Sequence, residues 1–167
     1  MNCPRADWTQ DKEFFRGLFR RAEEARVPLA GTLELTRRCR MRCVHCYLGD
    51  HERPDGQREM STEQVLDIMR QLANAGCLAM IITGGDPLLR SDFGQVYRTA
   101  KLSGIDVSVY TSGTDVTDEV VELFQDLPPR VVEITIHGST AETFERISGV
   151  KGSFRRVWQG IHRLHDG

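Results

Sequence analysis

What the sequence lacks narrows the class of protein before any motif is considered. No run approaches the roughly 18 consecutive apolar residues that a membrane-spanning helix needs, so we expect no membrane partner. Residues 1–7 also lack the apolar stretch of a secretory signal peptide. We therefore expect a cytoplasmic protein.

An excess of charge of one sign is missing too. Lys and Arg together number 22 against 24 for Asp and Glu, which gives a net charge of −2. A general nucleic-acid binder carries a basic excess, so we expect no nucleic-acid partner. Apolar residues make up 40% of the 167 residues and charged residues 28%, which is typical of one folded domain with a real core.

Cysteines are few, and their placement is uneven. Five cysteines in a cytosolic chain are not expected to form a disulfide framework, because that compartment keeps thiols reduced. Three of them, Cys39, Cys43 and Cys46, fall within eight residues, a crowding that usually indicates metal binding. Cys77 precedes an apolar run and is expected to be a packed thiol, and Cys3 lies near a terminus.

Short β-rich runs alternate with helical patterns along the rest of the chain. An amphipathic leading helix is predicted over residues 9–26, closed by Pro28 and Gly31. Strands are predicted at 32–36, 79–83, 106–111 and 131–137, and helices begin near residues 61, 91, 117, 139 and 153. Capping boxes are predicted at Ser61 with Gln64 and at Ser139 with Glu142, and residues 51–59 form a polar linker.

Four successive β/α units predict an α/β fold with parallel strands joined by right-handed helical crossovers. In such sheets and barrels the chemistry gathers at the C-terminal ends of the strands. The segments that follow the four predicted strands are the cysteine triplet, Gly84-Gly85-Asp86-Pro87, Thr111-Ser112-Gly113 and His137-Gly138. The organisation therefore predicts one site.

The cysteines have the spacing C-x3-C-x2-C. A short loop of this kind can wrap three thiolates around one face of an iron–sulfur cube and leave the fourth iron without a protein ligand. Four flanking arginines, at positions 37, 38, 40 and 42, are expected to favour the thiolate forms. Two other interpretations are three small buried residues on one helix face, which the arginines disfavour, and a zinc site completed by His45 or His51.

The strand, the cysteine triplet and the aromatic Tyr47 directly after it resemble the signature of the radical S-adenosylmethionine (radical SAM) superfamily. The resemblance implies that Cys39, Cys43 and Cys46 hold a [4Fe–4S] cluster. It implies that the open iron chelates the amino and carboxylate groups of S-adenosylmethionine, with Tyr47 near the adenine of that cofactor.

Three further segments resemble the same superfamily. Gly84-Gly85-Asp86-Pro87 is similar to its Gly-Gly-Glu-Pro motif, which contacts the methionine amino group, with Asp86 one methylene shorter than the usual Glu. Thr111-Ser112-Gly113 is similar to Thr-Asn-Gly, with Ser112 in place of Asn, and Thr135 stands where a hydroxyl residue contacts the cofactor. His137 is the candidate for a substrate or proton-transfer contact.

The resemblance covers roughly residues 30–165 and is closest to the peptide-modifying branch that often carries a SPASM domain. It implies a partial barrel, usually of six β/α units, of which this chain supplies four. We expect an N-terminal helical extension over residues 1–30 and a core over 31–167 that lacks the fifth and sixth units. A partner chain or segment is expected to cover the exposed edge of the fourth strand.

The implied function is that of an oxidoreductase. Its [4Fe–4S] cluster supports reductive cleavage of S-adenosylmethionine to a 5′-deoxyadenosyl radical, which abstracts hydrogen from a substrate. The resemblance favours a peptide substrate and an external one-electron reductant of the flavodoxin or ferredoxin type. The alternatives are a non-catalytic iron–sulfur or zinc-binding module and an inactive truncated fragment.

Overall fold

The computed structural model describes residues 8–49 and 59–167. Along the chain lie α1 (Trp8–Ala25), β1 (Ala30–Thr36), α2 (Thr62–Asn74), β2 (Ala79–Gly84), the 3₁₀ helix η1 (Pro87–Leu89), α3 (Phe93–Leu102), β3 (Asp106–Thr111), α4 (Asp118–Asp126), β4 (Val131–Ile134), α5 (Ala141–Ser148) and α6 (Ser153–Asp166). Cys3, His51 and nearly all of the predicted polar linker lie outside the described residues.

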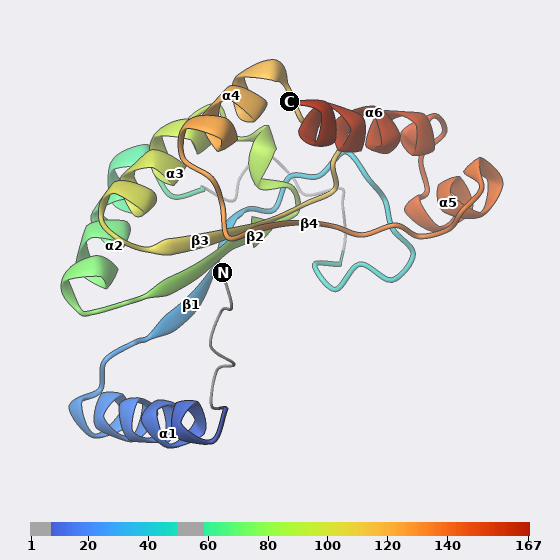
Figure 1. Ribbon diagram of the computed structural model, residues 1–167. Coiled ribbons are helices and arrows are strands. Elements are labelled where there is room, and N and C mark those ends of the chain that lie inside the picture. Colours follow the sequence, from blue (N-terminus) through green and yellow to red (C-terminus); the bar gives the residue numbers. More distant parts are fainter. Residues whose placement is uncertain (1–7, 50–58) are drawn as a thin grey trace.

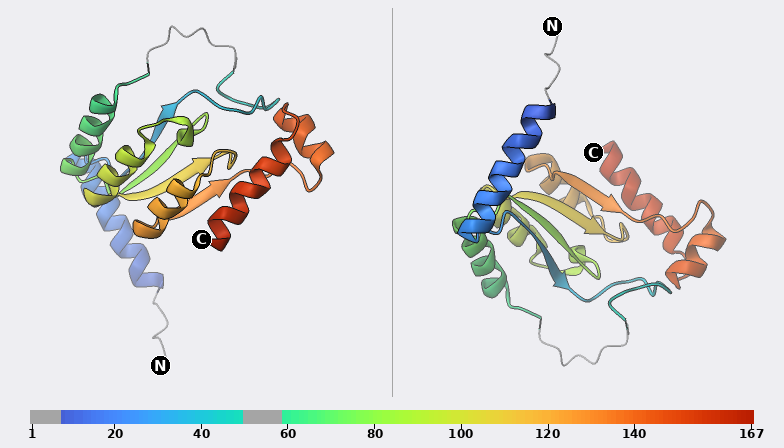
Figure 2. Two further views of the ribbon diagram at one scale, coloured as in Figure 1. Left: turned by 90° about the horizontal axis from the view of Figure 1, so that it is seen from above. Right: turned by 90° about the horizontal axis from the view of Figure 1, so that it is seen from below.

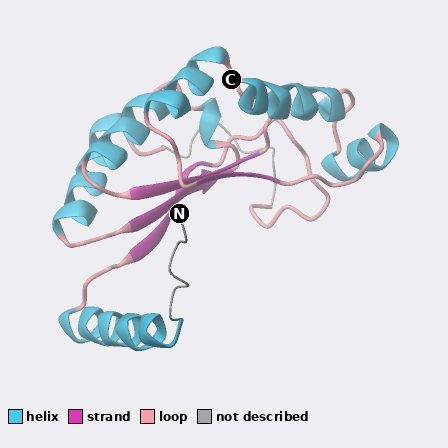
Figure 3. Cartoon of the chain, in the orientation of Figure 1, coloured by secondary structure: helices cyan, strands magenta, loops and turns pink. Residues whose placement is uncertain are grey.

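The four strands form one parallel sheet in the order β1-β2-β3-β4. Helices α2, α3 and α4 lie on one face of this sheet, and loops gather at the C-terminal ends of the strands (Figures 1 and 3). This arrangement confirms the predicted α/β class with a partial barrel of four parallel β/α units.

Alternate strand residues form the core, because successive side chains point to opposite faces of a sheet. The strand pairing places Leu33, Ile82, Val109 and Val132 in one row across the sheet. This row packs against the apolar faces of α2 and α3, and its two central members are fully buried. Cys77 is buried beside the same cluster, which confirms its predicted role as a packed thiol.

Several predicted element boundaries are corrected. Ser61 and Gln64 do form a capping box at α2, but the residue that caps α5 is Thr140, whose hydroxyl accepts from the Thr143 N–H at 3.3 Å, so the box at Ser139 and Glu142 is wrong. Gly31 lies inside β1. Strand β4 ends at Ile134, where its pairing with the last residue of β3 also ends.

Helix α1 is present as predicted, but its aromatic face is open. Phe14, Phe15 and Phe19 are each half or more exposed, and the helix lies apart from the other helices, beyond the start of β1 (Figure 1). Within residues 8–49 and 59–167, no helix combines the length and apolar character needed to cross a membrane.

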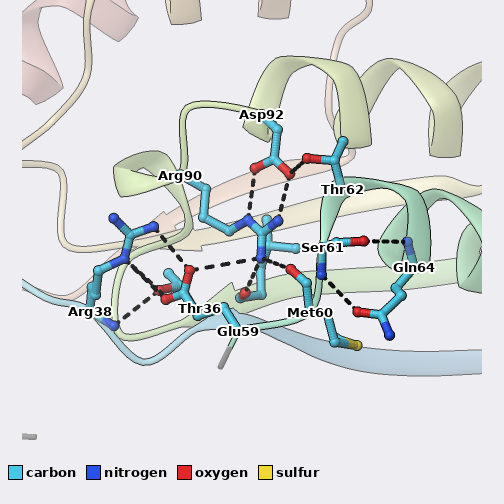
Figure 4. Close-up of polar contacts among 10 residues, drawn as sticks. Thr36, Arg38, Glu59, Met60, Ser61, Thr62, Gln64, Arg90 and Asp92 are labelled. Carbon is cyan, nitrogen blue, oxygen red and sulfur yellow. Dashed lines mark hydrogen bonds and ion pairs between the residues drawn. The ribbon is translucent and has the colours of Figure 1, made fainter. Parts of the chain in front are cut away.

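A buried arginine joins three elements at the end of β1 (Figure 4). The Arg90 guanidinium, 6% exposed, donates to the Met60 carbonyl at 3.0 Å and to the Leu35 carbonyl at 3.3 Å. It also bonds both Asp92 oxygens, at 2.7 and 2.5 Å, and the Thr62 hydroxyl donates to Asp92 at 2.7 Å. The side chain therefore connects the end of β1 to the starts of α2 and α3.

Replacing Asp92 by Asn tests this junction. The bond from the Arg90 guanidinium lowers the pKa of Asp92 to about 2, below the roughly 3.9 of an unfolded Asp. Its stabilising contribution is therefore complete above about pH 4 and is lost as the pH falls through about 2. We expect Asp92→Asn to lower the free energy of unfolding by about 1.5–3 kcal/mol at pH 7.

Urea unfolding of wild type and variant from pH 7 to pH 2 measures the effect. The difference between their free energies of unfolding should shrink as the pH falls toward 2. Asp126→Asn is the matched control, because Asp126 pairs with Arg98 on the exposed surface, where such pairs contribute about 1 kcal/mol or less. Asp92→Asn and Asp126→Asn could lower the free energy of unfolding by the same amount, or the loss in Asp92→Asn could be independent of pH. Either result would contradict the role given to the junction.

Candidate functional site

A cavity of about 440 Å³ opens at the C-terminal ends of the strands, a volume typical of small-molecule sites. Most of the site residues predicted from sequence line it together: Cys39, Cys43, Cys46, Tyr47, Gly84, Gly85, Thr111, Ser112, Thr135 and His137. The two predicted cofactor contacts that do not line it are Asp86 and Pro87, both of which are buried.

The strands add cavity residues that sequence reasoning missed. Thr32, Ile81, Tyr110 and Glu133 line the cavity from the strand positions between the core residues. The period-two alternation of the strands was the signal that could have found them, because every second residue must face away from the helices. This face of the sheet forms the floor of the cavity.

The cysteine segment is an irregular loop that α5 holds in place. Residues 37–49 contain no helix, so the interpretation of three cysteines on one helix face is wrong. Backbone hydrogen bonds run from the Arg42 N–H to the Ser148 carbonyl at 2.8 Å and from the Val44 N–H to the Ile147 carbonyl at 3.0 Å. Both views of Figure 2 place the loop beside α5 and the start of α6.

An apolar contact strengthens the same attachment. Met41, between the first two cysteines, is buried with Phe144 of α5 and Val157 of α6, and Cys39 and Cys43 pack against this cluster. The loop is therefore fixed by hydrogen bonds on its backbone and by one buried side chain, while its thiols face the cavity.

The double glycine after β2 is required by a close approach of two chain segments. The Gly85 N–H donates to the Thr36 carbonyl at 2.7 Å, and the Asp86 N–H donates to the Arg38 carbonyl at 2.8 Å. A Cβ on Gly84 would lie 2.1 Å from the Thr36 oxygen, and one on Gly85 would lie 2.3 Å from the Arg38 oxygen. Any side chain here would push the turn away from the stem of the cysteine loop.

The expected effect of the flanking arginines on the thiols is wrong for two of the three cysteines. Burial raises the pKa of Cys39 to about 11, with the negative charge of Asp86 adding to the shift, and burial also raises the pKa of Cys43. Arg40 instead pairs with Asp115, and Arg38 pairs with Glu59, so their charges are engaged elsewhere. A metal that bound these thiols would therefore have to displace their protons.

His137 lies against one of the cysteines. Its Nε2 atom is 3.5 Å from the Cys43 sulfur, and its ring centroid is 4.9 Å from that of His45. Burial, with a smaller effect of His45, lowers the pKa of His137. The structure therefore places the predicted catalytic candidate beside the thiols and inside the cavity.

The donor set fits an iron–sulfur cube. Within residues 8–49 and 59–167, no three His, Cys, Asp or Glu side chains gather around one point as the ligands of a single metal ion do. A cube accepts thiolates on separate irons, so three thiols that line one cavity suit it. Gly84, Gly85 and the hydroxyl residues Thr111, Ser112 and Thr135 line the same cavity.

Comparison with known proteins agrees with this geometry. The sequence profile of the Radical SAM superfamily matches residues 33–167. The chain belongs to the radical SAM superfamily. Enzymes of this superfamily use a [4Fe–4S] cluster and S-adenosylmethionine, which are the two cofactors expected from the sequence.

Curated relatives share about a third of the matched residues. An AdoMet-dependent heme synthase from Methanosarcina barkeri is 33% identical over 78% of this chain and 37% of its own. Mycofactocin maturase MftC from Mycolicibacterium smegmatis is 33% identical over 84% of this chain and 35% of its own. The chain therefore spans little more than a third of the length of these relatives.

Solved structures share the fold. Streptococcus suis SuiB bound to S-adenosylmethionine superimposes with a TM-score of 0.72 and 16% identity, over 99% of this chain and 39% of that one. The protein anSMEcpe with bound AdoMet gives a TM-score of 0.66 over 82% of this chain and 40% of that one. These likenesses support the partial-barrel architecture of the radical SAM core.

Two glycines test the clamp on the cysteine loop. Gly149 (φ +69°) and Gly152 (φ +76°) both have left-handed backbones, but a Cβ on Gly149 would lie 2.6 Å from the Arg42 oxygen, whereas one on Gly152 would meet nothing within 4 Å. Both alanine variants carry the backbone cost of roughly 1–2 kcal/mol. We expect the free energy of unfolding of Gly149→Ala to fall by about 1–3 kcal/mol more than that of Gly152→Ala, because the added Cβ clashes with the cysteine loop.

Thermal unfolding and the iron bound per chain after anaerobic reconstitution are the two measurements. Gly149→Ala should lower both, and Gly152→Ala should lower only the unfolding temperature. Equal iron contents in the two variants would show that α5 does not hold the cysteine loop in its binding shape.

Proposed function

We propose that this chain is the core of a radical SAM enzyme that cleaves S-adenosylmethionine reductively. The observation that supports this most is the single cavity that combines three loop thiols with the glycine turn after β2 and the hydroxyl residues after β3. A reduced [4Fe–4S] cluster held by Cys39, Cys43 and Cys46 would supply the electron that cleaves S-adenosylmethionine to methionine and a 5′-deoxyadenosyl radical, and this radical would abstract hydrogen from the substrate. The division into a helical extension (1–30) and a core (31–167) belongs to this proposal.

In this proposal, the residues of the chain bind and orient the cluster and S-adenosylmethionine. Cys39, Cys43 and Cys46 are the proposed iron ligands, and Gly84 and Gly85 line the same cavity beside the stem of the cysteine loop. Thr135 offers its hydroxyl group to the cofactor from beyond the end of β4, and Thr111 and Ser112 line the cavity as the proposed cofactor-facing residues at the end of β3. Tyr47, whose hydroxyl donates to Glu34 at 3.1 Å, is held at the cavity mouth, where it could stack with an adenine.

A peptide is the proposed substrate class. Among the relatives, PqqA peptide cyclase from Rhizobium meliloti is 30% identical over 82% of this chain, and SuiB has been solved with the precursor peptide SuiA.

Within the described sheet, β4 pairs only with β3. We propose that a further strand, from a partner chain or a longer form of this one, covers β4, and that a flavodoxin- or ferredoxin-type protein supplies electrons in the cytoplasm.

Cofactor cleavage is the direct test. The chain is reconstituted anaerobically with iron and sulfide, reduced with dithionite and given S-adenosylmethionine, and 5′-deoxyadenosine is measured. We expect product from wild type and from Cys77→Ala, whose thiol is buried in the core away from the cavity, and none from Cys43→Ala.

The same preparation separates the alternatives. Zinc in place of iron would overturn the proposal in favour of a zinc-binding module. A bound cluster without 5′-deoxyadenosine, even with a partner that covers β4, would favour a non-catalytic iron–sulfur module or an inactive fragment.

The substrate class has its own measurement. Peptides deuterated at their carbon positions are offered to the reduced, reconstituted chain, and deuterium in 5′-deoxyadenosine is read by mass spectrometry. We expect deuterium transfer from a peptide and none from a deuterated porphyrin, the compound class suggested by the heme synthase relative. Transfer from the porphyrin alone would contradict the peptide assignment.

A further inference from the structure

Asp86 is the least exposed charged residue in the described chain, at 0%. Oxygen Oδ1 accepts from the Thr111 hydroxyl at 2.8 Å and from the Leu88 N–H at 3.2 Å. Oxygen Oδ2 accepts from the Ser112 N–H at 3.2 Å and also from the Ser112 hydroxyl. A carboxylate has about four acceptor sites, so this one is fully used by the protein itself.

The place of Asp86 in the fold agrees with the full use of its acceptor sites by the protein. It follows the glycine turn after β2 and caps η1, and its partners Thr111 and Ser112 stand at the end of β3. Gly84, Gly85, Thr111 and Ser112 line the cavity, and Asp86 does not. Its carboxylate therefore lies behind the cavity wall and connects the two halves of that wall.

The connection continues to the cysteine loop. The Thr114 N–H donates to the Ser112 hydroxyl oxygen at 3.3 Å, and the Thr114 hydroxyl donates to Asp115 at 2.7 Å. The Arg40 guanidinium, between the first two cysteines, donates to Asp115 at 2.6 Å. A continuous set of polar contacts thus runs from Asp86 through the β3 end to the loop that carries the thiols.

We propose that Asp86 is a positioning residue that holds both walls of the cofactor cavity, with Ser112 as its matched partner, and that it does not bind the cofactor's ammonium group. This inference rests on the proposed function, because it assigns the role of a residue in the same cavity. A direct contact would need an acceptor site directed into the cavity, and all four are occupied behind it.

The residue types at positions 86 and 112 fit one another. A glutamate at position 86 would add a methylene to a fully buried site, and overpacking of this kind is destabilising. The serine hydroxyl reaches the short aspartate and also bonds the following turn, in which the Thr114 N–H donates to it at 3.3 Å. Asp86 and Ser112 therefore match one another in length and in hydrogen bonding.

The test uses Asp86→Asn, Ser112→Ala and the double variant, with Asp106→Asn as the control at the exposed, opposite end of β3. In the apo protein, Asp86→Asn sets an amide donor against the Ser112 N–H and should lower the unfolding temperature. Ser112→Ala should do the same, and the double variant should lose less than the sum of the two. Asp106→Asn should change little.

Binding to the reconstituted protein separates positioning from direct contact. The probes are S-adenosylmethionine and 5′-methylthioadenosine, which lacks the amino acid part and thus the ammonium group. A displaced wall should raise the Kd of both probes by a similar factor, about tenfold. A loss confined to S-adenosylmethionine, with an unchanged unfolding temperature, would overturn the inference and make Asp86 a direct ligand.

Failure of the proposed function is distinguishable from failure of this inference. Wild type that binds neither probe would contradict the proposed function. The unfolding temperatures of the apo variants would still decide the role of Asp86, since the coupling between positions 86 and 112 does not depend on a cofactor. Additive losses from the two single variants would overturn the pairing.

Discussion

The close approach between the stem of the cysteine loop and the turn after β2 is the constraint on which the site depends. Residues 36–38 extend the first strand alongside Gly84 and Gly85, with two backbone hydrogen bonds and no space for a Cβ. This contact continues the pairing of β1 and β2 past the strand ends, so it fixes the position of the cysteine loop relative to Gly84 and Gly85. The register of these two strands therefore determines how the two cavity-lining segments lie.

Polar groups behind the cavity then hold what the backbone has brought together. Arg90 joins the end of β1 to two helices, and Asp86 joins the ends of β2 and β3. Both are charged groups out of water, which is costly unless every partner is present. In the described chain no buried side-chain nitrogen or oxygen is left without a partner. Such saturation favours one arrangement of the strand ends over many, which is what a cofactor site needs.

The sequence predicted the four β/α units, the parallel strands and the gathering of motifs at one edge, because these follow from periodicity and from the end of the sheet at which parallel strands place their loops. It did not predict that Phe14, Phe15 and Phe19 would be exposed, since amphipathic spacing identifies a face and not its partner. Nor could it place the Asp86 carboxylate behind the wall, because side-chain direction depends on contacts between residues 25 positions apart. The thiol pKa values also depended on burial, which flanking charges do not reveal.

Burial of the thiols and clamping of their loop are two aspects of one arrangement. A loop anchored by Met41 and by backbone bonds to α5 keeps its cysteines partly out of water, which raises the pKa of Cys39 and of Cys43. The higher pKa values favour the protonated thiols of Cys39 and Cys43, so a metal that bound them would have to replace those protons. Because the loop shape is fixed by contacts outside the cavity, little ordering remains to oppose that exchange. The contacts that bury Cys39 and Cys43 therefore also hold their loop in shape independently of any bound group.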